Sequence, residues 1–186
     1  MAFSLEALKA NHNVTVQWRS FELRPKGSPP ISEEYRATID VKRQYFQQMA
    51  RDHYGVEINE GPFGIDSRPA LVGAKYAEAQ GVGDAYHEAV FSAYWQEASS
   101  IEEISVLGDI AAAVGLDRDA FVAALGEEEW DTAVTADVHQ AYRYGLNGVP
   151  ALVFANKYLV TGAQPYEVLA QVVEQIRDEQ NKLPGS

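Results

Sequence analysis

The chain has 186 residues, 46% of them apolar and 23% charged, with a formal net charge of −12 at pH 7. This length and composition suit one folded unit with a substantial apolar core. The composition excludes a nucleic-acid binder, because phosphate neutralisation needs clustered Lys and Arg and the 15 basic residues are scattered. The sequence contains no cysteine, so its side chains offer no disulfide, no zinc thiolate and no thiol nucleophile.

Membrane insertion is also not expected. No apolar run approaches the roughly 20 residues of a membrane span, and no basic segment followed by an apolar stretch resembles a signal peptide. The sequence therefore predicts a cytoplasmic protein that has neither a membrane nor a nucleic acid as partner.

The N-terminal part predicts a helix followed by a strand. Residues 3–10 carry apolar side chains among good helix formers, which is typical of a short helix. Residues 14–19 alternate apolar and polar side chains, and the pattern continues to Leu23, which predicts a strand. Prolines and glycines in residues 25–30 then end regular structure.

From Ser32 the pattern is helical for more than a hundred residues. Ser67 followed by Arg68-Pro69 predicts an N-cap with proline in the first turn, and Asp117 predicts the cap of a short helix. Further helices are expected at 82–96, 99–114 and 128–144. One stripe of the last helix is expected in the core: Trp130, Val134, Val138 and Tyr142. Glycines fit helix C-terminal stops at five positions: Gly55, Gly81, Gly115, Gly126 and Gly145.

The C-terminal part predicts a β-hairpin and a final helix. Apolar segments 151–154 and 158–160 flank a tight polar turn at 155–157. An amphipathic helix follows Pro165. Pro150 precedes the first strand, where a proline that donates no ladder hydrogen bond is tolerated. The Val149-Pro150 bond can instead be cis, at about 0.5–1 kcal/mol against trans, which leaves the preceding backbone groups free to face a ligand.

Several segments together resemble a known family. Gly148-Val149-Pro150 before a hairpin, followed by Thr161-Gly-Ala-Gln-Pro165, resembles the cis-proline loop and last helix of DsbA-like thioredoxin-fold oxidoreductases. The resemblance is closest to FrnE-type dithiol-disulfide isomerases, near the 2-hydroxychromene-2-carboxylate isomerases. Further matching segments are residues 17–25, 67–70, 74–78 and 86–95. The resemblance implies an α/β fold of DsbA type: a thioredoxin-like core from residues 1–30 and 147–186, with a large all-helical insertion at 31–146.

The sequence departs from the family pattern at its beginning. Family members begin with a strand that leads into Cys-x-x-Cys at the start of the first helix, where the helix N-terminus stabilises a thiolate. Residue 1 aligns just beyond that motif, so the 186 residues are expected to lack the first core strand and both cysteines. In this fold that strand lies between the strands at Val14 and Ala151, and without it both have unpaired edges.

Three explanations for this departure remain open. The start site is assigned too late, or a fragment closes its sheet by shifting or by borrowing a strand from another chain, or the fold is marginal. We favour the first.

The resemblance implies thiol-disulfide oxidoreductase or isomerase activity, in which a thiolate attacks a disulfide through a mixed disulfide. A protein or peptide thiol or disulfide, or a small thiol, would bind at Gly148, Val149 and Pro150. No catalytic residue is assigned, because the chain has no thiol. The alternatives are a non-catalytic peptide-binding module and a glutathione-dependent isomerase, so glutathione is the one cofactor considered. The family also allows a homodimer.

Other candidate residues carry little functional signal. Ser4 lies past the position of the redox motif and has no identifiable base beside it. The four histidines lack the spacing of metal ligands, so no metal site is predicted: they are His12, His53, His87 and His139. The acidic run 127–129 suits the first turn of a helix.

Overall fold

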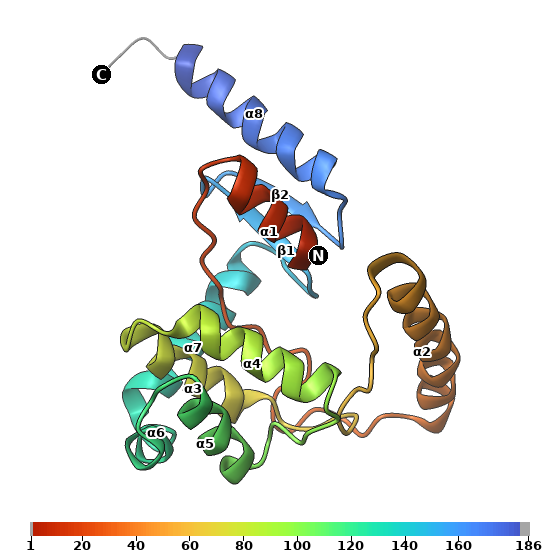
Figure 1. The fold of residues 1–186 in the computed structure, drawn as a ribbon, viewed down its shortest axis with the longest axis vertical. Coiled ribbons are helices and arrows are strands. Elements are labelled where there is room, and N and C mark those ends of the chain that lie inside the picture. The colour runs from red at the N-terminus through yellow and green to blue at the C-terminus, as the bar shows by residue number, and fades with distance from the viewer. Residues whose placement is uncertain (1, 183–186) are drawn as a thin grey trace. The chain divides into compact units, whose positions relative to one another are not determined.

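The computed structural model describes residues 2–182 and divides them into two compact units (Figure 1). The first unit joins the two ends of the chain, residues 2–23 and 139–182, and the second comprises residues 24–138. The expected core segments 1–30 and 147–186 extend beyond the described residues at both ends. Residue 1 and residues 183–186 lie outside them. The expected boundaries of the helical insertion, at residues 30/31 and 146/147, stay predictions.

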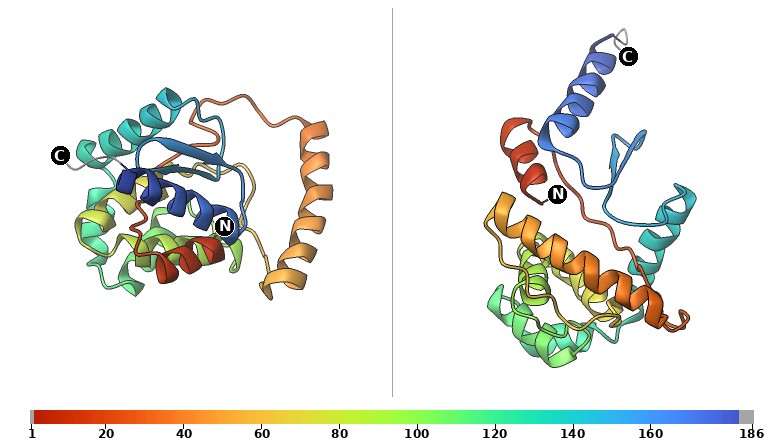
Figure 2. Two further views of the ribbon diagram at one scale, coloured as in Figure 1. Left: turned by 90° about the horizontal axis from the view of Figure 1, so that it is seen from above. Right: turned by 90° about the vertical axis from the view of Figure 1, so that its right-hand side faces the viewer.

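The first unit packs two helices on a hairpin. Its elements are α1 (Ala2–Asn11), β1 (Ala151–Phe154), β2 (Tyr158–Thr161) and α8 (Tyr166–Lys182), together with the end of α7 (Glu128–Arg143). Leu5 and Leu8 of α1 meet Leu169 and Val173 of α8 in a buried cluster, and alternate side chains of both strands pack against it. The two helices therefore cover one face of the hairpin, as Figures 1 and 2 show.

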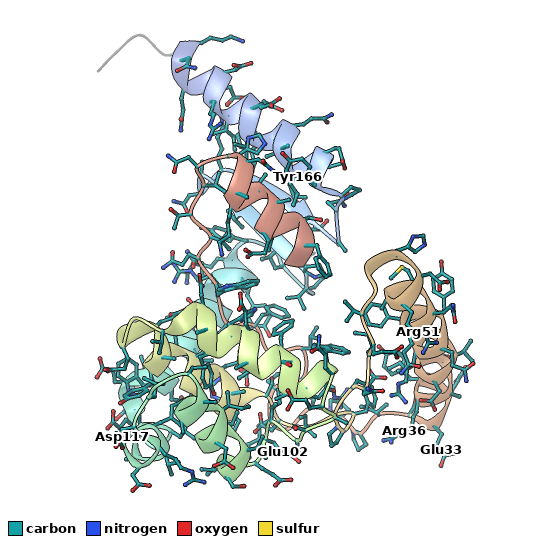
Figure 3. All side chains as sticks on the ribbon, viewed as in Figure 1. Glu33, Arg36, Arg51, Glu102, Asp117 and Tyr166 are labelled. Carbon is teal, nitrogen blue, oxygen red and sulfur yellow. The ribbon has the colours of Figure 1, made fainter. Side chains whose placement is uncertain are left out.

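The second unit is helical. It contains α2 (Glu33–Tyr54), α3 (Arg68–Ala79), α4 (Gly83–Trp95), α5 (Ile104–Ala113) and α6 (Arg118–Ala124), and most of α7. Its largest fully buried side chains, Tyr86 and Phe121, lie in one cluster that joins α3, α4, α5 and α6. Figure 3 places Glu33, Arg36 and Arg51 along α2 and Asp117 at the start of α6.

Capping residues explain several helix ends. The Ser32 side chain accepts a hydrogen bond from the Tyr35 amide, and Asp117 accepts one from the Ala120 amide at 2.8 Å. Gly55 ends α2 with φ of 64°, a conformation that glycine adopts without a Cβ penalty. Ser67 holds the predicted N-cap position of α3, but its side chain makes no capping hydrogen bond. The helix expected from residue 99 begins at Ile104, because residues 101–102 form a turn.

The strand predicted over residues 14–23 is wrong. Within residues 2–182 the sheet contains only β1 and β2. The predicted segment keeps the burial pattern of a strand, since Val14, Val16 and Trp18 are half-buried while the residues between them are exposed. Those three side chains pack against the apolar cluster of the first unit. Apolar residues at every second position indicate that side chains are buried alternately. A strand also needs a neighbouring backbone with which to form hydrogen bonds.

The stripe predicted on α7 is buried only in part. Val134 and Val138 are buried, and Trp130 is half-buried. Tyr142 is 53% exposed and contacts the Phe21 ring edge-on, with ring centroids 6.3 Å apart. The period of α7 therefore identifies a face, and the packing around each turn decides how deeply that face is covered.

The hairpin register is defined by its turn and by its buried side chains. Ala151 pairs with Thr161, Val153 with Leu159, and Phe154 with Tyr158 in antiparallel order. The Lys157 amide donates to the Phe154 carbonyl at 2.9 Å across a turn whose two central residues have φ of 49° and 53°. Positive φ at both central positions is the mark of type I′ turns, whose twist matches that of the strands.

Candidate functional site

The three predicted binding residues, Gly148, Val149 and Pro150, lie together immediately before β1 in the first unit. The Val149-Pro150 peptide bond is cis. The Pro150 carbonyl accepts a hydrogen bond from the Gly162 amide at 2.9 Å, which continues the β1–β2 pairing by one step beyond Ala151. The loop is therefore anchored to the hairpin at Pro150, and we call residues 148–150 the docking loop.

The docking loop is exposed at Val149 and Pro150 and half-buried at Gly148. The Val149 side chain is 53% exposed, and Pro150 is exposed as well. A Cβ built on Gly148 would meet no atom within 4 Å, so the space beside that glycine is open. Among the residues that the structure describes, neither the amide nor the carbonyl of Val149 makes a hydrogen bond. Solvent or a ligand is left to satisfy these two groups.

The segment after β2 lies beside the docking loop in the pairing register. Gly162 has φ of 78°, a left-handed conformation suited to glycine, and donates its amide to Pro150. The Gln164 side-chain amide donates to the Thr161 carbonyl at 3.0 Å. The Pro165 carbonyl accepts the Leu169 amide in the first turn of α8. These contacts connect the hairpin to the start of α8.

One polar contact in this unit could not be foreseen from the sequence. The Tyr166 hydroxyl lies 3.1 Å from Nε2 of His12, which joins the start of α8 to the end of α1. Figure 3 labels Tyr166 at that end of α8. The two residues are 154 positions apart in the chain, and neither sits in a pattern that signals pairing. His12 therefore contributes to the packing of α1 against α8 in this structure.

A charged cluster fixes the far end of the hairpin. Glu179 of α8 accepts hydrogen bonds from Tyr158 and from Lys157, the latter at 2.9 Å. The Tyr158 hydrogen bond, followed by that of Lys157, lowers the pKa of Glu179 to about 2. Hydrogen bonds with Tyr158 and then with Glu179 raise the pKa of Lys157 above its ordinary value. Lys157 is exposed, and Tyr158 and Glu179 are half-buried. The cluster ties the hairpin to α8, so it has a structural role.

The helical unit has a shallow cavity of about 370 Å³ between α2 and residues 60–63. Arg43 forms ion pairs with Asp40, at 3.1 Å, and with Glu60. The Arg36 guanidinium lies 6.0 Å from the centroid of the Phe63 ring. Two basic and two acidic side chains line the cavity, so their charges balance and it does not select for an ion of either sign.

The described residues contain no group of three or more acidic or histidine side chains placed to hold a metal ion. Ser4 is half-buried in the first turn of α1. No helix within residues 2–182 is both long enough and apolar enough to cross a bilayer. The docking loop is therefore the candidate site on which the functional argument rests.

Helices packed on a small hairpin that follows a Val-Pro step, with a separate helical unit, define a thioredoxin-fold protein of DsbA type. Residues 1–174 match the model of the DSBA-like thioredoxin domain, and the chain belongs to that family. This confirms the resemblance and the fold class predicted from the sequence.

Individual relatives agree with this assignment. The chain is 30% identical to the uncharacterised protein YwbO of Bacillus subtilis, over 95% of this chain and 88% of YwbO. A probable DsbA oxidoreductase of Streptomyces coelicolor superposes with a TM-score of 0.81 at 24% identity, covering 100% of this chain and 84% of that one. A 2-hydroxychromene-2-carboxylate isomerase superposes with a TM-score of 0.77 at 22% identity, covering 97% and 90%. The two solved structures show a shared fold.

Proposed function

We propose that the docking loop binds the backbone of a protein or peptide thiol or disulfide, or a small thiol, in a thiol-disulfide oxidoreductase or isomerase. The observation that carries this proposal is the exposed residue Val149, whose backbone amide and carbonyl make no hydrogen bond within the described residues. An extended ligand satisfies such a donor and acceptor pair with two main-chain hydrogen bonds. The name of one similar solved protein, a probable DsbA oxidoreductase, supports this reaction class. The name of the other, a 2-hydroxychromene-2-carboxylate isomerase, supports the alternative of an isomerase.

The reaction itself requires a thiolate that attacks one sulfur of a disulfide and forms a mixed disulfide, while the original S–S bond breaks and its other sulfur leaves as a thiolate. The 186 residues contain no cysteine, so their part in that reaction is to position the ligand. A thiol would come from outside these residues, either from protein or from glutathione. Without such a thiol, the docking loop acts as a peptide-binding module. A cytoplasmic location and a homodimer stay predictions.

Thermal unfolding with added ligand tests the proposal. A ligand at ten times its Kd stabilises the folded state by about 1.4 kcal/mol, which raises Tm by about 3–6 °C for a chain of this size. We expect such a shift with an unfolded, alkylated polypeptide or with millimolar glutathione. The first result favours peptide docking and the second favours a glutathione-dependent isomerase. No shift with either ligand would contradict a docking role for the loop.

Two variants localise the binding. Gly148→Val places a branched side chain in the open space of the docking loop, so the fold is retained while the ligand is blocked. Gly126→Ala is the control, because that glycine lies in the second unit and its Cβ would meet its nearest atom at 3.5 Å. We expect the ligand-induced shift to disappear in Gly148→Val and to persist in Gly126→Ala. Equal shifts in both variants would place binding elsewhere.

A further inference from the structure

The shallow cavity of the helical unit is formed by one face of α2 and by residues 60–63. Arg36, Asp40 and Arg43 lie on that face, because they are spaced by four and three positions along the helix. Glu60 and Phe63 contribute side chains from the other wall. All of the lining residues belong to the second unit, and we call this space the α2 cavity. Figure 3 labels Arg36 on α2.

Both walls of the α2 cavity are held in place by hydrogen bonds. The Gly61 amide donates to the Tyr94 carbonyl at 2.6 Å, and the Tyr94 hydroxyl donates to the Pro62 carbonyl at 3.3 Å. From α2, the Gln47 side-chain amide donates to the Ile58 carbonyl at 3.1 Å. A ligand therefore meets walls that already have their positions, which lowers the entropy cost of binding.

The charges that line the α2 cavity are paired unequally. The Arg43 guanidinium lies 3.1 Å from the Asp40 carboxylate and also contacts Glu60, so two carboxylates share one cation. The Arg36 guanidinium makes no hydrogen bond or ion pair with any described residue. It lies 6.0 Å from the centroid of the Phe63 ring, a cation–π contact that orients it. The cavity therefore has one carboxylate in excess around Arg43 and one unpaired cation at Arg36.

Two of these charges are open to a ligand. The Asp40 side chain is 56% exposed, whereas that of Glu60 is 17% exposed. Arg36 is exposed as well. Arg36 and Asp40 are four positions apart, which places their Cβ atoms about 5–6 Å from each other on one face of the helix. Because Asp40 pairs with Arg43, a cation and an anion are available side by side.

This arrangement matches the head group of an α-amino acid. Its carboxylate and its ammonium are attached to one carbon, so each can form charge-assisted hydrogen bonds with the opposite charge at Arg36 or Asp40. An ion of a single sign would pair with only one of these two side chains. The lining residues carry no net charge, so a charged side chain on the ligand would stay unpaired. Pro62 and Phe63 instead offer it apolar contact.

We propose that the α2 cavity binds a free α-amino acid with an uncharged side chain, its carboxylate at Arg36 and its ammonium at Asp40. The volume of about 370 Å³ is near the lower limit of ligand cavities, about 300–1,000 Å³, which favours a molecule of this size over a long peptide. The inference goes beyond the proposed function, because the docking loop lies in the first unit and contributes no residue to the α2 cavity.

L-phenylalanine serves as the probe, in an NMR titration of the isotope-labelled chain at about pH 6, where an α-amino group is protonated. We expect a Kd of about 1 mM, with shifted amide signals at Gly61 and Phe63. Two analogues each lack one charge: L-phenylalaninamide has no carboxylate, and N-acetyl-L-phenylalanine has no ammonium. Each should bind about tenfold or more weakly, because a charge-assisted hydrogen bond is lost. An analogue that binds as tightly as phenylalanine, or no shifted signal at about 50 mM phenylalanine, would overturn the proposal.

Paired variants of α2 test the two contacts from the protein side. Arg36→Gln and Asp40→Asn each remove one charge from the cavity lining, and we expect each to weaken phenylalanine binding about tenfold or more. Lys42→Gln and Asp52→Asn make the same charge changes at exposed positions of α2 outside the lining, so binding should stay within about twofold. Equal affinities in a variant and its control would contradict the assigned contacts. Circular dichroism checks the folds, and the two analogues decide the question on the unmodified chain if a variant unfolds.

Two further results separate the free amino acid from other ligands and the α2 cavity from the docking loop. Glutathione carries the same head group in its γ-glutamyl part, together with one further carboxylate. If it displaced phenylalanine at an about tenfold lower concentration, the ligand would be a γ-glutamyl compound and the free amino acid would be overturned. Gly148→Val should keep phenylalanine binding within about twofold. Loss of binding in that variant would assign the probe to the docking loop and overturn the α2 cavity as its site.

Discussion

Gly73 in α3 allows close packing in the helical unit, and we expect its replacement by alanine to destabilise the protein. A Cβ at this position would lie 2.5 Å from the Tyr86 hydroxyl oxygen and 2.6 Å from Cζ of Phe121. Both rings are fully buried, so neither can move into solvent. Overpacking of this kind lowers the free energy of unfolding by about 1–3 kcal/mol. Because two contacts are this short, we expect a loss in the upper part of that range, about 2–3 kcal/mol. Alanine has a higher helix propensity than glycine, which offsets up to about 1 kcal/mol of this cost. The expected net decrease in the free energy of unfolding is about 1–2 kcal/mol.

Tyr86→Phe should relieve part of this loss. The Tyr86 hydroxyl has no hydrogen-bond partner among the described residues, and burial raises the pKa of Tyr86. A buried hydroxyl without a partner costs about 1–3 kcal/mol, so Tyr86→Phe alone is expected to be neutral or stabilising. Combined with Gly73→Ala, it removes one of the two short contacts and leaves that with Phe121. We expect a favourable coupling energy of about 1 kcal/mol between the two substitutions.

Urea unfolding of the four proteins, followed by tryptophan fluorescence, measures this cycle. Gly108→Ala in α5 is the matched control, because its Cβ would approach no atom closer than 3.2 Å. It is expected to cost less than Gly73→Ala. A Gly73→Ala protein as stable as the wild type, or a coupling energy of zero, would refute the packing argument. A clear loss in Tyr86→Phe alone would show that the hydroxyl has a partner, such as a buried water.

Three further substitutions probe the charges and the turn. The Lys75 ammonium lies 2.8 Å from the Asp137 carboxylate, and both side chains are at most 9% exposed. Lys75→Met should lower the free energy of unfolding in urea by about 3–5 kcal/mol, because it leaves a buried carboxylate unpaired. Adding Asp137→Leu to the same chain should restore most of that loss. A loss below about 1 kcal/mol would contradict a buried ion pair. Ala155 has φ of 49° in the hairpin turn, a left-handed conformation that asparagine tolerates better than alanine. Ala155→Asn should therefore raise the free energy of unfolding by about 0.5–1 kcal/mol with an unchanged m-value. A destabilised variant would argue against this turn conformation. The Arg68 hydrogen bond lowers the pKa of Asp131. The ionised Asp131 carboxylate therefore stabilises the folded state at pH values above its unfolded pKa of 3.8, and this stabilisation is lost as the pH falls through the lowered folded pKa. Asp131→Asn should make the free energy of unfolding less dependent on pH below about pH 4. Near neutral pH it should cost at most ~1 kcal/mol.

Helices were predictable because their signals are local. A cap such as Asp117 and a stop such as Gly55 act within one turn, and the structure places both as expected. The start of α5 shows the limit of this reasoning, because an apolar Ile101 belongs to a turn that precedes the helix. Local pattern alone does not distinguish an apolar residue in a turn from the first apolar residue of a helix.

Long-range partners were not predictable. The segment from Val14 to Trp18 has the alternating burial of a strand, yet its ladder depends on a backbone that no local pattern supplies. The contact between His12 and Tyr166 joins residues 154 positions apart. Tyr142 lies on an apolar stripe but meets Phe21 at the surface, because burial depends on which segment covers each turn.

The docking loop could be located from its motif, but the availability of its atoms depends on the hydrophobic core. A slip of one residue in the β1–β2 register would move an entire set of side chains to the other face. Leu152, Phe154 and Val160 pack into the cluster of α1 and α8, so a slip would expose them and lose their burial. The same register turns the backbone groups of Ala151 and Val153 away from β2. The core therefore fixes the hairpin register, and through the hydrogen bond between Gly162 and Pro150 that register holds the docking loop in place.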